Sequence, residues 1–234
     1  MTKSKYKYIL FKDLILKGWG FMRNFKKMLI VYLTLCLFFA VGCSAKEKVT
    51  PDMTATSMFD FFIKGDKEAI AKINVPNEEI DASAKIQKDT TISLVKNNLK
   101  SSGIEVKEEK LEELYNVRAE ALKKLTCTSE IISQAEDSAE VRIKSTYIDE
   151  VAIDNKAADD ALETVKQMGL TDQKEAINKV GDEYVKNLIN GYQSASPSQD
   201  TKEKIFKFTK KDKIWLPQSM VEFGNGIGLL AAGQ

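Results

Sequence analysis

One cysteine stands out among the side chains that could do chemistry, because of the residues before it. Cys43 ends an apolar run, and the small residues Ala40 and Gly42 flank Val41 directly ahead of it. A thiol is a nucleophile, and small side chains let a peptidase hold the extended backbone next to it. The chain has no histidine, which removes Ser-His-Asp and Cys-His sites and the usual zinc ligand sets. We therefore expect modification of the Cys43 thiol, and no catalytic residue, metal or cofactor.

The residues before Cys43 have the order of a secretory signal. Arg23, Lys26 and Lys27 form a positive head, and residues 28–41 form an apolar body of about fourteen residues. A transmembrane helix needs about twenty apolar residues, and the chain turns polar after Cys43. A plain membrane-spanning anchor is therefore the weaker interpretation.

Residues 40–43 resemble the lipobox of bacterial lipoproteins, although leucine is more usual than Ala40 at the first position. The resemblance implies that Cys43 accepts a diacylglyceryl group, that Ala40, Val41 and Gly42 are recognised by the signal peptidase, and that residues 22–42 are removed. Two acyl chains hold a protein stably, whereas one binds only marginally. We expect a protein anchored to the outer face of the cytoplasmic membrane, with residues 43–49 as a lipidated tether. An ordinary cleaved signal with an incidental cysteine is the alternative.

Residues 1–21 allow two interpretations. Their lysines alternate with aromatic and aliphatic residues, as in a basic amphipathic membrane helix. However, Met22 begins a signal of ordinary length, and residues 17–20 back-translate to a G-rich run like a ribosome-binding site. We favour translation from Met22, which makes residues 1–21 an untranslated or disordered extension.

The charge balance differs on the two sides of Cys43. The whole chain has 35 basic and 34 acidic residues, of which 8 and 1 lie in residues 1–43. The exported part therefore carries 27 against 33, a net charge of −6, which argues against a nucleic-acid partner. Cys36 leaves with the signal and Cys43 is alkylated, so Cys127 has no disulfide partner. We expect it to be a small buried hydrophobe.

The exported part predicts a single α+β domain over residues 50–234, with helices and a small antiparallel sheet built from two hairpins. Apolar periodicity and capping residues predict helices over residues 51–64, 66–73, 77–99, 107–125, 155–168 and 172–192. Alternating patterns predict one hairpin from 126–133 and 140–149, and a second over 202–216. Residues 220–232 are apolar and glycine-rich, and either pack on the sheet or form a short helix.

Two groups of residues could bind ions or phosphate. Five acids lie between the first hairpin and the next helix, namely Asp149, Glu150, Asp154, Asp159 and Asp160. Their carboxylate oxygens could hold calcium. However, EF-hand spacing is missing, and we favour a solvated loop with helix-capping acids. Residues 224–228 are similar to a phosphate-binding glycine loop, but are one residue short and lack room for a βαβ unit.

The last hairpin offers two further surfaces. It carries six lysines, namely Lys202, Lys204, Lys207, Lys210, Lys211 and Lys213. These lysines could approach anionic lipid or wall polymer. We favour the alternative, in which they protect an exposed edge strand from unwanted pairing. Four aromatic side chains on the predicted sheet could face a ligand beneath the helices, although aromatic core is the favoured role; they are Tyr147, Phe206, Phe208 and Trp215.

The lipobox, together with residues 59–66, 147–149 and 206–215, resembles a family of Gram-positive lipoproteins that carry a domain of unknown function. The resemblance covers nearly all of residues 50–233, and implies an α+β fold similar to the cystatin-like or NTF2-like sheets that wrap a helix. It supplies no catalytic residues. We predict a non-catalytic binding or regulatory module whose partner is a small ligand or an envelope protein. An envelope hydrolase that uses paired carboxylates, and a small solute-binding component of a transporter, are the alternatives.

Overall fold

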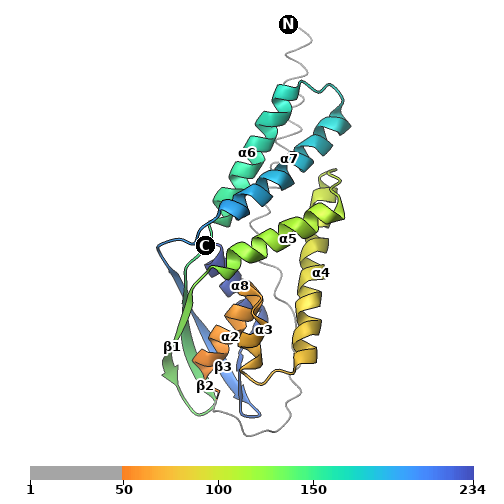
Figure 1. Cartoon of the computed structure of the whole chain (residues 1–234). Coiled ribbons are helices and arrows are strands. Elements are labelled where there is room, and N and C mark those ends of the chain that lie inside the picture. Colours follow the sequence, from red (N-terminus) through yellow and green to blue (C-terminus); the bar gives the residue numbers. More distant parts are fainter. Residues whose placement is uncertain (1–48) are drawn as a thin grey trace.

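A computed structural model describes residues 49–234. The predictions for the extension 1–21, for the signal 22–42 and for Ala40, Val41, Gly42 and Cys43 lie outside the described residues. The elements in chain order are α2 (Pro51–Lys64), α3 (Lys67–Ala71), α4 (Asn77–Ser101), α5 (Glu108–Lys123), β1 (Cys127–Gln134), β2 (Ser138–Ser145), α6 (Glu150–Met168), α7 (Gln173–Ser194), β3 (Lys202–Lys211), β4 (Ile214–Pro217) and α8 (Met220–Ala231). Helices and a four-stranded antiparallel sheet confirm the predicted α+β class (Figure 1).

The sheet joins the two predicted hairpins edge to edge. Its strand order is β1-β2-β3-β4, so the second hairpin continues the first through antiparallel pairing of β2 with β3. The helices α6 and α7 lie between β2 and β3 in the sequence. The pair therefore forms an insertion that leaves the sheet after β2 and returns to it at β3.

The core lies between one face of the sheet and the helices α2 and α8 (Figure 1). Residues at alternate positions of β2 and β3, such as Val141 and Phe208, are buried on this face, as the period of two requires. Met58 and Phe59 of α2 are fully buried above them. Phe223 of α8 packs its ring on Phe208, with ring centroids 5.8 Å apart.

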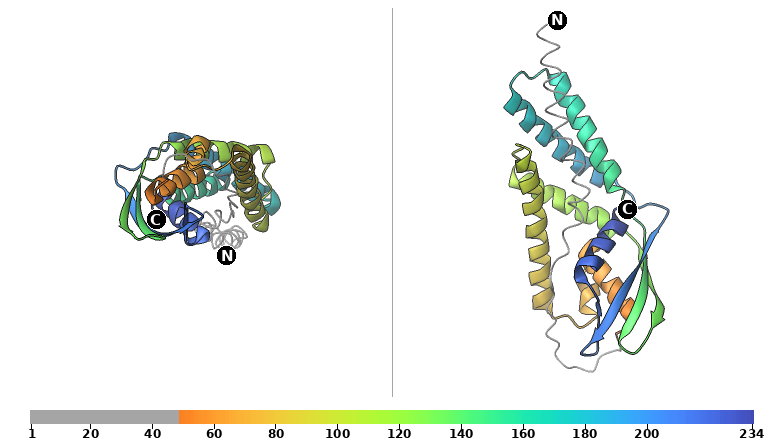
Figure 2. Two further views of the ribbon diagram at one scale, coloured as in Figure 1. Left: turned by 90° about the horizontal axis from the view of Figure 1, so that it is seen from below. Right: turned by 180° about the vertical axis from the view of Figure 1, so that it is seen from behind.

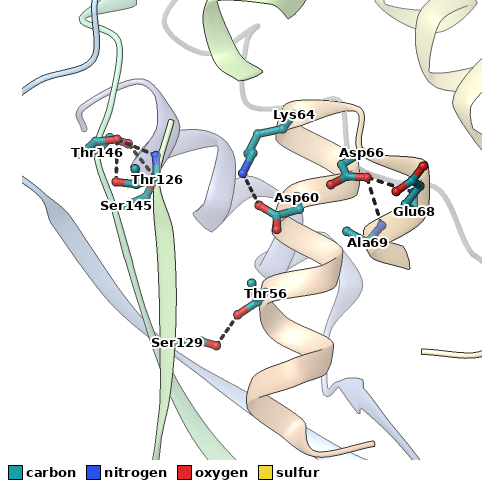
Figure 3. A network of polar contacts seen from close by, with 10 residues as sticks. All are labelled: Thr56, Asp60, Lys64, Asp66, Glu68, Ala69, Thr126, Ser129, Ser145 and Thr146. Carbon is teal, nitrogen blue, oxygen red and sulfur yellow. Dashed lines mark hydrogen bonds and ion pairs between the residues drawn. The ribbon is translucent and has the colours of Figure 1, made fainter. Parts of the chain in front are cut away.

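Local signals set the ends of α2 as predicted. Pro51 occupies the first turn, where its missing N–H leaves no helical hydrogen bond unmade. Gly65 ends the helix with a φ of 70°, a left-handed conformation that glycine adopts without strain. Asp66 then caps α3 by accepting hydrogen bonds from the backbone N–H groups of Glu68 and Ala69 (Figure 3).

The prediction that the second strand reaches residue 149 is wrong. β2 ends at Ser145, which pairs with Cys127, the first residue of β1, and with Lys202, the first residue of β3. Neither β1 nor β3 continues beyond these pairs, so β2 has no partner strand there. An alternating sequence pattern alone does not extend the strand. Asp149 instead caps α6 by accepting a hydrogen bond from Ala152 N, and the helix begins at Glu150, five residues earlier than predicted.

The end of the chain combines both alternatives that its composition allowed. Residues 220–231 form helix α8, and this helix packs on the sheet. Gly226 makes the close approach possible, because a Cβ there would lie 2.4 Å from Cε1 of Phe206. The glycine run is therefore part of a packed helix, where it does not have the strand-loop-helix geometry of a phosphate site.

Helices α6 and α7 form an antiparallel pair that we call the helical arm. Figure 1 and the rear view in Figure 2 show the arm projecting from the end of the molecule opposite to the turns of the two β-hairpins. Gly169 ends α6 with a φ of 65°, and Asp172 caps α7 by accepting a hydrogen bond from Glu175 N. None of the helices in residues 49–234 has the length and apolar character needed to cross a membrane.

Candidate functional site

The most distinctive chemistry among the described residues is a group of buried polar side chains with a half-buried arginine at the base of the arm. Its members, which we call the polar cluster, are Arg118 of α5, Glu150 and Asp154 of α6, and Tyr184 and Tyr192 of α7. Glu150 and Asp154 are one helical turn apart, so both carboxylates project from one face of α6. The two tyrosines are two turns apart on α7, and they face those carboxylates.

Glu150 is the centre of the cluster and is only 1% exposed. Nη2 of Arg118 donates to both of its carboxylate oxygens at 2.9 and 3.2 Å, and Nε donates at 3.3 Å. The Tyr192 hydroxyl donates to the same carboxylate at 3.2 Å. This arrangement compensates the charge of Glu150 with three donor groups, two from the Arg118 cation and one from Tyr192.

The protonation states of the cluster follow from its burial. Burial raises the pKa of Tyr192, and the neighbouring Glu150 raises it further, so the hydroxyl stays a donor at neutral pH. Burial also raises the pKa of Tyr184, as does its contact with Asp154. For Arg118, burial opposes the charged form, but Glu150 outweighs it and raises the pKa above its ordinary value.

The geometry of the cluster favours a positioning role over acid-base catalysis. The carboxylate of Glu150 already accepts hydrogen bonds from Arg118 and Tyr192, and that of Asp154 accepts one from the buried Tyr184. These bonds tie α5, α6 and α7 together at the point where the arm leaves the sheet. The sequence alone did not predict the cluster. Arg118 nevertheless gave a signal, because it occupies a position in the otherwise apolar stripe of α5.

The five acids predicted as a solvated, helix-capping group have three different environments. Asp149 caps α6 as predicted. Glu150 and Asp154 are buried, so the prediction of a solvated loop is wrong for these two. Asp159 is exposed, and the half-buried Asp160 forms an ion pair with Lys156. Within residues 49–234, no group of three or more cysteine or carboxylate side chains is placed to hold a metal ion.

The four predicted ligand-facing aromatics do not share one surface. Phe206 and Phe208 of β3 and Trp215 of β4 are at most 4% exposed, which fits the core role that the sequence also favoured. Tyr147 lies beyond the end of β2, in the link to α6. Its ring lies close to Gly233, the residue before the last, where an added Cβ would lie 2.4 Å from Cδ2 of Tyr147.

Cys127 has the environment of an unreactive thiol. It is half-buried against the core at the start of β1, and its charged neighbours are Asp60 and Lys64. These two residues form an ion pair on α2 (Figure 3). Burial, together with the negative charge of Asp60, raises the pKa of the Cys127 thiol to about 12, although Lys64 opposes the shift. The thiolate, which is the reactive form, is therefore negligible at neutral pH.

The lysines of the last hairpin are only partly on an edge. β4 pairs with residues 208–211 alone, so the first part of β3, with Lys202, Lys204 and Lys207, has no strand beyond it in the described sheet. Three of the ammonium groups lie 5.6–5.7 Å from aromatic ring centroids, in the pairs Lys202–Tyr147, Lys204–Phe206 and Lys210–Trp215. These contacts place the lysine stems over the aromatic core at its margin.

Comparison with known proteins supports the fold. No protein-family model matches the chain, and no curated protein matches it. Among solved structures, the fold matches the crystal structure of ycdA, a candidate lipoprotein from Bacillus subtilis, with a TM-score of 0.57 and 18% sequence identity. The match covers 79% of this chain and 56% of the other, so this chain spans little more than half of that protein's length. At this identity the match shows a shared fold alone, and the likeness to cystatin-like or NTF2-like sheets stays a prediction.

Proposed function

We propose that this protein is a lipoprotein of the outer face of the cytoplasmic membrane, anchored through Cys43, and that its domain is a non-catalytic binding or regulatory module of the cell envelope. The observation that carries the proposal is the lipobox-like sequence at residues 40–43, directly ahead of a folded domain. The fold shared with a candidate lipoprotein supports it.

Two features support binding over catalysis. The chain has no histidine, and the buried carboxylates of the polar cluster are held by Arg118, Tyr192 and Tyr184. The arm projects from the end of the molecule opposite to the start of α2 (Figure 1). An anchor attached ahead of α2 would leave the arm pointing away from the membrane, towards an envelope protein or a small ligand.

The anchor is tested by metabolic labelling with palmitate in cells that express the full chain. We expect Cys43→Ala to lose the label and to appear as unprocessed precursor or in the medium. Cys36→Ala is the matched control, because Cys36 lies inside the apolar body of the signal, and it should keep the label. Undiminished labelling of Cys43→Ala would refute the anchor.

The binding role is tested by crosslinking in intact cells, with identification of the captured partners. We expect partners that are lost when the arm tip is altered, for example by Met168→Asp, while membrane recovery stays unchanged. If the purified protein instead turned over a cell-wall or ester substrate, and if a carboxylate substitution abolished that turnover, the non-catalytic assignment would fail.

A further inference from the structure

Two adjacent isoleucines are exposed at the end of the sheet nearest to the start of the domain. Ile131 pairs with Val141 and Ser133 pairs with Glu140, so Ile132 is the additional residue of a β-bulge. Ile131 and Ile132 are 38% and 40% exposed. In a regular strand, alternation would turn only one of the two towards solvent.

The first turn of α2 lies against the same part of β1. The hydroxyl of Ser129 donates to the carbonyl oxygen of Asp52 at 2.8 Å and contacts the hydroxyl of Thr56 at 2.5 Å (Figure 3). Met53, the residue after Asp52, is 38% exposed. We call Met53, Ile131 and Ile132 the apolar end patch.

The chain reaches the domain at this same end. Val49 is half-buried against the core directly before α2. At about 3.5 Å per residue, the six residues from Ser44 to Val49 span at most about 20 Å, so an anchor on Cys43 keeps the start of α2 close to the bilayer. The arm tip lies at the opposite end of the molecule (Figures 1 and 2).

The charges of the two hairpin turns at this end of the molecule balance one another. The turns of the two β-hairpins are joined by a hydrogen bond from Lys210 N to the Asp137 carbonyl oxygen. They carry three lysines and three acids in total, namely Lys210, Lys211, Lys213, Glu136, Asp137 and Asp212. Attraction to anionic lipid therefore contributes little, and any contact depends on the apolar side chains.

We propose that the apolar end patch rests in the headgroup region of the bilayer that carries the anchor, which holds the domain upright with the arm directed away from the membrane. This orientation rests on the proposed acylation of Cys43. When the patch enters the headgroup region, its side chains leave water. The domain loses little further translational freedom in this step, because the tether has already confined it to the membrane.

The test is depth-dependent quenching of a fluorophore on the acylated full chain. Both variants carry Cys127→Ala, which removes the native free thiol of the domain. Ile132→Cys then supplies one thiol for labelling in the apolar end patch, and Met168→Cys supplies one in the matched control. Met168 is 44% exposed at the end of α6, so both sites are open to labelling. The labelled proteins are purified from membranes and placed in phosphatidylethanolamine–phosphatidylglycerol vesicles that contain a headgroup spin-label quencher.

We expect several-fold stronger quenching at residue 132 than at residue 168. A label at Ser133→Cys should report the same contact and lose it when Ile131→Asn and Met53→Gln are introduced. Removing phosphatidylglycerol should leave the quenching within about twofold, since the charges balance. Equal quenching at residues 132 and 168, or loss of quenching without phosphatidylglycerol, would overturn the proposal.

Two other outcomes are separated by the same samples. Protein recovered from the soluble fraction without palmitate contradicts the anchor and, with it, this orientation. Acylated protein whose residue 132 is unquenched contradicts the apolar end patch alone. Disulfide crosslinking between two Ile132→Cys chains in the membrane would assign the patch to a second copy, and would likewise overturn the proposal.

Discussion

Replacing Arg118 with methionine tests whether the polar cluster holds the arm in place. Arg118→Met keeps much of the side-chain volume and removes the cation from Glu150, which is 1% exposed. The carboxylate then keeps the Tyr192 hydroxyl as its donor among the contacts described for it. Removing one partner of a buried ion pair typically costs about 3–5 kcal/mol of unfolding free energy.

We therefore expect Arg118→Met to lower the free energy of unfolding by about 3–4 kcal/mol at pH 7. The loss lies at the lower end of the usual range because the side chain of Arg118 is itself 27% exposed.

Urea unfolding of the purified protein at pH 7 measures this loss. For a domain of this size, the loss corresponds to a Tm lower by about 6–16 °C. The control is Arg142→Met, because Arg142 pairs with Glu130 and Glu203, whose side chains are 56% and 54% exposed. We expect this variant to lose less than about 1 kcal/mol. A loss for Arg118→Met that is below about 1 kcal/mol would refute the reasoning.

Two further predictions concern packing and reactivity. Gly181→Ala should destabilise the docking of the arm on the α4–α5 loop, because the new Cβ would lie 2.1 Å from Cγ2 of Ile104. Overpacking of this kind costs about 1–3 kcal/mol, and adding Ile104→Ala should restore part of that stability in thermal unfolding. If the losses of the two single variants simply add in the double variant, the contact is contradicted. Cys127 should react with a thiol reagent at pH 8 only after urea is added, because burial raises its pKa to about 12; fast labelling of the folded protein would contradict this environment.

Features that depend on neighbours in the sequence were predicted well. Pro51, Gly65 and Asp66 fixed the ends of α2 and α3 through the backbone geometry that each residue favours. The turn of the last hairpin was also placed correctly, with positive φ angles at Asp212 and Lys213. The end of β2 was placed wrongly, because a strand ends where its partners end, and the partners of Ser145 come from other parts of the chain.

The sequence by itself determined the α+β class, most helix and strand positions, and the signal-like segment that ends at Cys43, since these follow from periodicity, capping and local order. Only the tertiary structure brought Arg118 to Glu150, joined β2 to β3 across the arm, and exposed Ile132 through a bulge. These features depend on which distant segments pack together. A charge in an apolar stripe, such as Arg118, signals a buried partner, but its identity is set by the fold.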